Sequence, residues 1–361
     1  MELIYRGQNL EDKIVDDLFN GDIKSVLDIG ANGIHLSNSY FFIQNGCSAV
    51  LVEPSPQAFN NLKDTYKGND KVELFNVAIA QKNEKEMIFW ESGEHLGLGD
   101  VSLLGTLHKK ELNRWKGTQN TFKEIKVNVW DFPKLLNEST IKKFDLISID
   151  CEGEDINILK QMNLKELECK CLIIEWNGIE SVKEEILKIV SEYGMTLEHK
   201  NGENLIFVKK PMKILIKFPT RGRREVFFNT LNKYYEHLED IDNVNFVITL
   251  DGDDDNMNND EVTKLLDGYE NLKYYYGNSK TKIEACNKDI YDLDFDILLL
   301  ASDDMVPQTK GYDTIIRNNM IKNYPDKDGV LWFYDGYNKQ INTLSIMGVE
   351  YYKRFNYIYH P

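Results

Sequence analysis

The chain has 361 residues, of which 42% are hydrophobic and 28% charged, a balance typical of globular proteins rather than of disordered or collagen-like chains. Its 59 acidic and 43 basic side chains give a formal net charge of −16, which repels the phosphates of nucleic acids and of anionic membranes. We therefore expect no nucleic-acid partner. The length is roughly two to three times that of a typical domain, which predicts two domains with separate cores.

The five cysteines are scattered and lack the paired spacing of a zinc site, which favours reduced thiols and a cytoplasmic location. The first residues do not have the apolar core of a secretory signal. No apolar run approaches the roughly 20 residues that span a bilayer, so we expect a soluble protein without a transmembrane segment.

Short apolar runs rich in β-branched residues alternate with helical patterns between residues 25 and 208, which is typical of a parallel sheet covered by helices on both faces. The expected strands are 25–29, 49–52, 72–78, 146–149 and 172–175, with a closing hairpin near 195–197 and 205–208. After Lys209-Lys210-Pro211 a new series begins, with strands expected at 213–218, 246–250, 272–276, 297–300 and 330–333. We predict an α/β fold with two domains, residues 1–210 and 211–361, the first of them a doubly wound sheet.

A nucleoside site is expected at the ends of the first two strands. Asp28 ends the first strand, and Gly30 and Gly33 stand in the following turn, where glycine lets a cofactor approach the backbone. The second strand ends at Glu53, where a carboxylate can bind both hydroxyls of a ribose. The dinucleotide pattern G-x-G-x-x-G is missing, which favours S-adenosylmethionine over NAD. The alternative is that Asp28 and Glu53 serve ordinary capping or turn chemistry.

Four motifs in order resemble the FkbM-like S-adenosylmethionine-dependent methyltransferases: Asp28-Ile-Gly-Ala-Asn32-Gly, Val52-Glu53-Pro-Ser-Pro, Asn76-Val-Ala78 and Ile149-Asp150-Cys-Glu152-Gly-Glu154. The resemblance covers residues 20–208 and implies a class I methyltransferase that acts on a hydroxyl of a sugar or natural product. It implies that Asp28, Gly30 and Asn32 lie around the methionine moiety of the donor, that Glu53 holds the ribose, and that Asn76 to Ala78 flank the adenine. The loop after Asn32 is one residue shorter than the pattern of that family.

Methyl transfer to a hydroxyl needs a base that removes a proton while the oxygen attacks the sulfonium donor. Asp150 is the first candidate because it stands at a strand end that faces the crevice, and Glu152 and His108 come next. Alternatively, Asp150, Glu175 and Asn177 at the ends of adjacent strands hold a divalent cation through oxygen ligands.

Two of these side chains also have simpler interpretations. The acids of Glu152-Gly-Glu154 suit the start of a helix, where the macrodipole favours negative charge. His108 belongs to the long stretch from residue 91 to 121, which we interpret as a lid or acceptor wall, and an exposed histidine without a role is the simpler expectation there.

The later domain begins with a strand that runs into a loop carrying Arg221 and Arg223, which suit a pyrophosphate through bidentate donation. The next strand ends at Asp251, and another is followed by Ser302-Asp303-Asp304. Acids beside a pyrophosphate repel it unless a cation intervenes, so this pattern predicts a nucleoside diphosphate bridged by Mg²⁺ or Mn²⁺. Two alternatives are that Asp303 and Asp304 cap the next helix, and that residues 253–255 form only a solvated acidic loop.

Residues 212–361 resemble the GT-A glycosyltransferases through Phe218-Pro-Thr-Arg221-Gly-Arg223, Gly277-Asn-Ser-Lys-Thr-Lys282 and Ser302-Asp303-Asp304. The resemblance implies a Rossmann-like GT-A fold that uses a nucleotide sugar, for which we expect a uridine diphosphate sugar. It implies that Arg221, Asp251 and Lys282 line the nucleotide pocket, that Asp303 contacts the ribose or donor sugar, and that Asp304 binds the metal.

The chain ends earlier than is usual for GT-A enzymes. Either the domain is truncated at its C-terminus, or Asp335 serves as the base and His360 reaches the metal. We expect a glycan-tailoring enzyme of polysaccharide biosynthesis that combines O-methyl transfer to a saccharide hydroxyl with metal-dependent glycosyl transfer. Two alternatives stay open: a methyltransferase whose GT-A domain is inactive or only binds a glycan, and a non-catalytic carbohydrate-binding or assembly protein.

Overall fold

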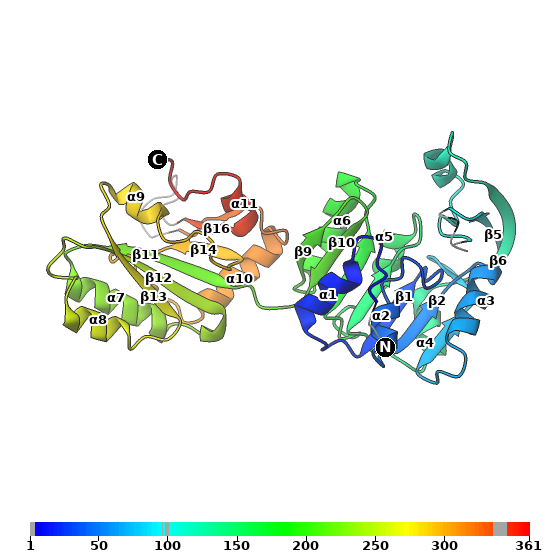
Figure 1. Cartoon of the computed structure of the whole chain (residues 1–361), viewed down its shortest axis with the longest axis horizontal. Helices are drawn as coiled ribbons and strands as arrows, with labels where there is room; N and C mark the ends of the chain where they lie inside the picture. Colours follow the sequence, from blue (N-terminus) through cyan, green and yellow to red (C-terminus); the bar gives the residue numbers. More distant parts are fainter. Residues whose placement is uncertain (1–3, 96, 98–100, 335–344) are drawn as a thin grey trace. The chain divides into compact units, whose positions relative to one another are not determined.

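The computed structural model describes residues 4–95, 97, 101–334 and 345–361. The chain divides into two compact units, Met1–Lys209 (unit 1) and Lys210–Pro361 (unit 2), whose elements are labelled in Figure 1. Among the described residues, every helix is too short or too polar to cross a bilayer.

The main sheet of unit 1 has seven strands in the order β3-β2-β1-β7-β8-β10-β9. Neighbouring strands pair in parallel from β3 to β8, and β10 runs antiparallel to both β8 and β9. The expected parallel sheet is therefore confirmed. The bounds are β1 (Ser25–Ile29), β2 (Ser48–Val52), β3 (Val72–Phe75), β7 (Leu146–Ile149), β8 (Cys171–Glu175), β9 (Thr196–Lys200) and β10 (Asn204–Val208).

Helices cover both faces of this sheet because successive residues of its central strands point to opposite sides. Val26 packs in one core cluster with side chains of α1 (Glu11–Phe19), α2 (Tyr40–Gln44) and α3 (Pro56–Thr65). Leu27 packs in the other cluster with side chains of α4 (Phe132–Glu138), α5 (Asp155–Leu159) and α6 (Glu180–Ser191). Two cores on opposite faces hold the central strands, so the ends of these strands are fixed points for a site.

A second, three-stranded sheet extends from unit 1 and was not expected. It has the order β4-β6-β5, in which β5 (Glu84–Ser92) and β6 (Phe122–Trp130) form a long antiparallel hairpin and β4 (Ala78–Ile79) pairs in parallel with β6. Figure 1 shows the hairpin as a curved teal ribbon. A short 3₁₀ helix, η1 (Glu111–Trp115), lies between its strands in the sequence. The single strand expected at 72–78 is in fact divided between β3 and β4.

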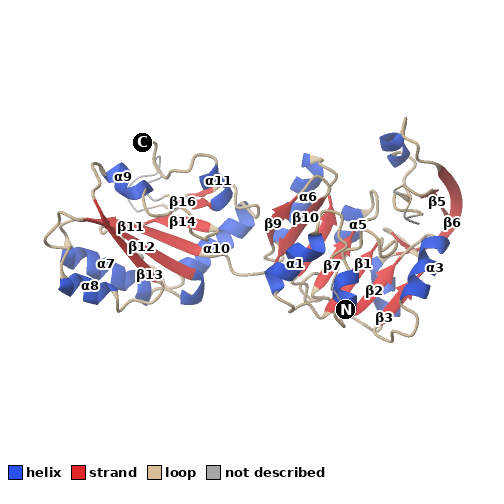
Figure 2. Cartoon of the chain, viewed as in Figure 1, coloured by secondary structure: helices blue, strands red, loops and turns tan. Residues whose placement is uncertain are grey.

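Unit 2 contains one six-stranded sheet in the order β13-β12-β11-β14-β16-β15. Its first four strands are parallel, and β16 runs antiparallel to β14 and β15. The bounds are β11 (Ile214–Thr220), β12 (Val244–Asp251), β13 (Leu272–Gly277), β14 (Ile297–Leu300), β15 (Val330–Leu331) and β16 (Ile346–Gly348). Helices flank both faces of this sheet (Figure 2).

Alternation along β11 again divides the core. Ile216 packs with side chains of α7 (Arg224–Glu236), α8 (Asp260–Leu266) and α10 (Tyr312–Asn323). Leu215 packs on the other face with side chains of α9 (Lys282–Asn287) and α11 (Val349–Lys353).

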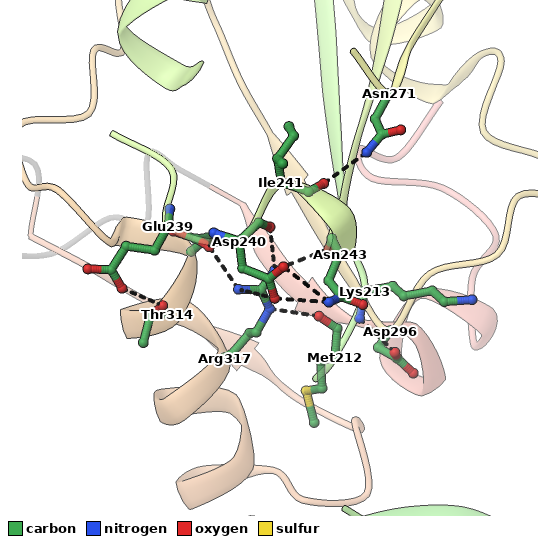
Figure 3. A network of polar contacts seen from close by, with 11 residues as sticks. Met212, Lys213, Glu239, Asp240, Ile241, Asn243, Asn271, Asp296, Thr314 and Arg317 are labelled. Atoms are coloured by element: carbon green, nitrogen blue, oxygen red, sulfur yellow. Dashed lines mark hydrogen bonds and ion pairs between the residues drawn. The ribbon is translucent and has the colours of Figure 1, made fainter. Parts of the chain in front are cut away.

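The buried Arg317 of α10 fixes the start of β11. Its Nε donates to the Met212 carbonyl at 2.8 Å, its Nη1 to Asp313 Oδ2 at 2.8 Å and its Nη2 to the Asn243 carbonyl at 3.1 Å. Figure 3 shows the guanidinium between the segment before β11 and the short η2 (Ile241–Asn243), which precedes β12. The network therefore sets the relative positions of the two strands whose far ends carry Arg221 and Asp251.

Candidate functional site

A pocket of about 840 Å³, part of it open to solvent, lies at the carboxyl ends of β1, β2 and β7 in unit 1. Strand ends are where open α/β sheets bind ligands. Among the residues that line the pocket are Asp28, Gly30, Asn32, Glu53, Ala78, Asp150 and Glu152, all of them candidates from the sequence.

The turn after β1 requires glycine at position 30. Gly30 has φ +91°, and a Cβ at this position would lie 1.8 Å from the carbonyl oxygen of Asp150. Its N–H and that of Ala31 both donate to the Val52 carbonyl at 3.0 Å. Glycine therefore lets the first turn touch the ends of β2 and β7 at once. Among the described residues, nothing lies within 4 Å of a Cβ at Gly33.

Glu53 joins the two loops that follow β1 and β2. Its side chain is 3% exposed, Oε2 accepts from the N–H of Asn32 at 2.9 Å, and Oε1 accepts from the N–H of Ser55 at 2.7 Å. Burial raises the pKa of Glu53 to about 8, against the effect of these two donors. Asn76 stabilises the loop after β2, because its Nδ2 donates to the carbonyls of Glu53 and Pro54 at 2.8 and 3.1 Å.

The side chain of Asp28 is oriented by a hydrogen bond from a serine hydroxyl. Its Oδ2 accepts from Ser39 Oγ at 2.6 Å, and burial raises its pKa to about 6. The cap of α3 is Ser55, whose Oγ accepts from the N–H of Ala58 at 3.3 Å. Asp28 and Glu53 therefore do not cap α3, although the bond from the Ser55 N–H gives Glu53 the turn contact of the alternative interpretation. Both residues line the pocket.

Three carboxylates gather at the ends of β7 and β8. One oxygen from each of Asp150, Glu152 and Glu175 lies within 4.8 Å of those of the other two. Burial, and then repulsion between the neighbouring acids, raises the pKa of Asp150 and Glu175 well above the ordinary range. Burial raises the pKa of Glu152 to about 7, and nearby Arg114 opposes this shift.

The sequence did not indicate Arg114, which lies in η1 within the hairpin connection. Its Nη1 donates to Glu152 Oε2 at 2.9 Å and its Nη2 to Asn177 Oδ1 at 2.8 Å. The cation hypothesis grouped Asn177 with Asp150 and Glu175. In the structure Asn177 Oδ1 accepts a hydrogen bond from Arg114, and Glu152 takes its place beside Asp150 and Glu175.

The stretch from residue 91 to 121 forms one wall of the pocket through Ser102, Leu103, Gly105 and Leu107. His108 in this wall is 29% exposed, and its Nε2 lies 2.6 Å from Glu154 Oε1, so it is neither fully exposed nor without a partner. Helix α5 begins at Asp155, and Glu154 occupies its N-cap position without a side-chain hydrogen bond to the helix backbone. Asp155 accepts from the N–H groups of Cys151 and Gly153 in the preceding turn, at 2.9 and 3.0 Å. The helix-start interpretation therefore holds for Glu154, whereas Glu152 lies in the turn before the helix.

A second pocket lies at the carboxyl ends of β11 and β12 in unit 2 and reaches the start of α9. Six candidates from the sequence line it: Arg221, Arg223, Asp251, Lys282, Ser302 and Asp303. Arg221 Nη1 lies 2.7 Å from Asp251 Oδ2 and 2.7 Å from Asp253 Oδ1. Arg223 Nη2 lies 3.1 Å from Asp303 Oδ1. The predicted cations and acids are thus brought together as ion pairs.

Asp304 is exposed and accepts from Ser302 Oγ at 2.6 Å, a hydrogen bond that lowers its pKa. The next helix, α10, begins at Tyr312 after Gly311, so the capping alternative for Asp303 and Asp304 is wrong. Asp254 is buried and accepts from the N–H of Gly222 at 2.6 Å, so it does not belong to a solvated loop.

The two remaining candidates lie near the C-terminus. Asp335 is outside the described residues. His360 follows Tyr359, which α9 anchors through a hydrogen bond from Asn287 Nδ2 to the Tyr359 carbonyl at 2.7 Å. Within the described parts of the chain, Asp304 and His360 belong to no cluster of three close metal-ligating side chains.

Sequence reasoning also missed Lys217, a fully buried lysine of β11 whose Nζ donates to Thr249 Oγ1. Thr249 lines the pocket of unit 2 and donates to Asp289 Oδ2 at 2.5 Å. Burial lowers the pKa of Lys217 to about 8. Its position in an apolar strand gave no signal of these partners.

Residues 28–197 match the family described as the methyltransferase FkbM domain. Unit 1 contains an FkbM methyltransferase domain. The matched range begins at Asp28, near the end of β1, and includes β2, β7 and β8. The strand ends that form the pocket and the three carboxylates therefore belong to the FkbM domain. The mixed sheet of unit 1, with its parallel central strands, is consistent with a Rossmann-like methyltransferase fold.

No curated protein matches the chain. Among similar solved structures is the mannosyltransferase PcManGT from Pyrobaculum calidifontis in complex with GDP-Man and Mn²⁺ (14% identity, TM-score 0.34), in a match over 40% of this chain and 47% of that one. This chain thus spans about half the length of that protein.

Two methyltransferase structures are also similar to this chain. The precorrin-6y C5,15-methyltransferase from Geobacter metallireducens has 14% identity and a TM-score of 0.32, over 58% of this chain and 91% of that one. A methyltransferase from Geobacter sulfurreducens has 11% identity and a TM-score of 0.28, over 55% and 77%.

Proposed function

We propose that unit 1 is an S-adenosylmethionine-dependent O-methyltransferase that acts on a saccharide hydroxyl. The observation that carries this proposal is one pocket in which Glu53 and Asp28, at the ends of adjacent strands, lie beside a third strand end with Asp150. An FkbM match over the same strands supports the reaction class.

The residues of the pocket fit the donor. Each oxygen of Glu53 accepts one backbone N–H and keeps capacity for a second donor, as a ribose with two hydroxyls requires. Asp28, Gly30 and Asn32 stand where the resemblance puts the methionine moiety. Ala78, Ile79 and Phe89 supply an apolar wall for the adenine. When bound, the donor supplies an electrophilic methyl group on a sulfonium centre.

Asp150 is the proposed base. It lines the pocket at the end of β7, and in its ionised form its carboxylate can take the proton when the acceptor oxygen forms its bond to the methyl carbon. The proton passes from the hydroxyl to the carboxylate of Asp150 while the bond from carbon to sulfur breaks. Glu152 and His108 are the alternative bases.

For unit 2 we propose metal-dependent glycosyl transfer from a nucleotide sugar on the same glycan pathway. The supporting observation is the pocket at parallel strand ends that combines Arg221, Arg223 and Lys282 with Asp251 and Asp303. A diphosphate beside these acids is repelled unless a cation intervenes. Asp304 is the proposed metal ligand, His360 a possible second one, and Asp335 the proposed base.

A glycan-binding role for unit 2 without catalysis is the second candidate. Arg221 already pairs with Asp251 and Asp253, so a phosphate must displace a carboxylate to reach it. Hydrolysis of a nucleotide sugar by the full chain separates the two roles, because a binding module leaves the sugar intact.

Two variants of unit 1 test the proposed reaction. We expect Glu53→Ala to weaken S-adenosylmethionine binding at least about tenfold, because the lost hydrogen bonds to a charged group contribute roughly 1.5–3 kcal/mol each. We expect Asp150→Asn to lower turnover by roughly 10²-fold or more while donor affinity changes little. Calorimetry measures affinity, and circular dichroism checks the fold. Parental donor affinity in a folded Glu53→Ala protein contradicts the donor site, and parental turnover in Asp150→Asn transfers the role of base to Glu152 or His108.

A further inference from the structure

The strand register brings Asp150 and Glu175 together. Strands β7 and β8 are parallel neighbours in which Ile149 lies opposite Ile174, so the residues that follow, Asp150 and Glu175, stand at the same edge of the sheet. Glu152 joins them from a turn in which it has φ +48°. One oxygen from each of the three carboxylates lies within 4.8 Å of the other two.

The described residues do not balance the charge of this cluster when its acids are ionised. Arg114 is its cationic partner and pairs with Glu152 at 2.9 Å, while its other nitrogen is bonded to Asn177. Three ionised carboxylates against one guanidinium leave two negative charges, which a bound cation would neutralise. Another acid, Asp155, is nearby and contributes to the repulsion at each of the three.

Glu175 provides a second and independent observation. The residue is 6% exposed, and within the described part of the chain its Oε2 is fully covered and has no hydrogen-bond partner. Buried carboxylate oxygens are nearly always bonded, because leaving one unpaired costs a large desolvation penalty. Since this carboxylate lies within the cluster, the partner that it lacks belongs there.

We propose that Asp150, Glu152 and Glu175 bind a divalent cation, Mg²⁺ or Mn²⁺, through one carboxylate oxygen each. Oxygen ligands and partial access to solvent suit these hard ions, which usually keep several positions for water or substrate. Asp150 and Glu152 line the pocket, so the remaining positions face the place of the acceptor.

This inference deepens the proposed function and rests on it for the role of the ion, which is to bind an acceptor with two adjacent oxygens, such as a saccharide diol. Each carboxylate needs only one oxygen for the ion. Asp150 therefore keeps its second oxygen to take the proton of the acceptor hydroxyl.

The test is a Mn²⁺ titration of the chelator-treated full chain, followed by the electron paramagnetic resonance signal of free Mn²⁺, without nucleotide or methyl donor. To remove any contribution of unit 2, the parent carries Asp304→Ala. We expect this parent to bind one equivalent, and Glu175→Gln to weaken it by at least about tenfold, since even outer residues of metal sites contribute 10- to 100-fold. The matched control Glu53→Gln changes a buried acid of the same pocket and is expected to leave Mn²⁺ binding unchanged.

No bound equivalent in the parent, or equal affinity in parent and Glu175→Gln, overturns the cation site. If Glu175→Gln does not fold, Glu152→Gln and Asp150→Asn replace it with the same expected loss. Calorimetry with S-adenosylhomocysteine separates this inference from the proposed function. Binding of that product without binding of Mn²⁺ refutes only the cation site, and the reverse result refutes the donor site and leaves the cation site in place.

Discussion

The carboxylates of the FkbM pocket are buried, whereas most acidic side chains of folded proteins are exposed to solvent. Burial raises the pKa of Asp28 to about 6, of Glu152 to about 7 and of Glu53 to about 8. A pKa above the value of the unfolded chain means that the folded state holds its proton more tightly than the unfolded state does. Without a bound ligand, these residues therefore make the stability of unit 1 depend on pH.

We predict that the free energy of unfolding of unit 1 falls as pH rises from about 5 to 8. The unfolded chain releases these protons near its ordinary carboxylate pKa, about 4, whereas the folded chain keeps them until its raised pKa values are passed. The stabilisation is present at low pH and is lost through this window, by a total on the order of a few kcal/mol.

Urea titrations at several pH values, with chelator and without donor, measure this dependence. The variant Glu53→Gln should show a smaller fall with pH, because it removes one of the buried groups that titrate. A lysine partner lowers the pKa of surface acids such as Glu180. The titration of these acids therefore changes the free energy of unfolding only at lower pH, outside this window. Constant or rising stability between pH 5 and 8 would argue against the buried, protonated state of these acids.

The positions of single residues were predictable where the strand itself supplies them. Asp28, Glu53 and Asp150 each follow a short apolar run, and parallel strands bring such ends to one edge. The contact between Arg114 and Glu152 was not predictable, because it depends on how the hairpin connection returns to the sheet. Likewise, the choice of Glu152 rather than Asn177 for the acidic cluster follows from the turn after β7, which no spacing rule describes.

At the scale of elements, Arg317 joins α10 to the segments before β11 and β12. Its partner Asp313 is fully buried and also accepts from the N–H groups of Glu239 and Asp240, both at 3.1 Å. Figure 3 shows that several of these bonds end on backbone carbonyls rather than on side chains. The network thus joins α10 to the backbone of the segments that precede β11 and β12.

We predict that Arg317→Met destabilises unit 2 by about 3 kcal/mol, because removing one member of a buried pair leaves the other charge and several carbonyls without partners. The matched control is Arg224→Met, whose ion pair with Glu261 lies at the surface and should contribute little. Denaturant unfolding followed by tryptophan fluorescence measures both. Equal stability of the two variants would show that the network is not a major contact of the fold.

The central strands of both sheets were predictable because 297–300 is apolar at every position and 146–149 at every position except Ser148, a pattern typical of a sheet buried on both faces. The β5–β6 hairpin was missed because much of it is exposed and rich in lysine and glutamate, so its alternation is weak. Strand 72–78 divides near Asn76, whose side chain bonds the backbone of the β2 loop instead of continuing the sheet. This interruption depends on a tertiary contact, so the hydrophobic pattern of residues 72–78 did not indicate it.

At the scale of the whole molecule, each core cluster draws its residues from one unit. The clusters around Leu27 and Val26 contain residues of unit 1, and those around Ile216 and Leu215 contain residues of unit 2. A chain with separate cores need not unfold in one step. Ligands of the two proposed sites should therefore stabilise different parts of the same chain.

We predict two calorimetric unfolding transitions that respond to different ligands. S-adenosylhomocysteine at about 100 times its dissociation constant should stabilise the unit 1 transition by roughly 2.7 kcal/mol. Uridine diphosphate added in the presence of Mn²⁺ should raise the unit 2 transition and should leave the unit 1 transition where Mn²⁺ alone puts it. Mn²⁺ should increase uridine diphosphate affinity at least tenfold, about 1.4 kcal/mol, because it offsets repulsion between the diphosphate and Asp303 and Asp304.

Asp304→Ala should abolish the increment that Mn²⁺ gives, whereas Arg221→Ala should weaken nucleotide binding with or without the metal, because a guanidinium contacts phosphate directly. Titrations of parent and Asp304→Ala, each with Mn²⁺ and with chelator, provide the comparison. Mn²⁺ added without nucleotide is the control, since the acidic cluster of the FkbM domain is expected to respond to it alone and to shift only the unit 1 transition. Equal uridine diphosphate affinity in all four titrations would exclude a metal-bridged donor site in unit 2, and the glycan-binding role would then be favoured for that unit.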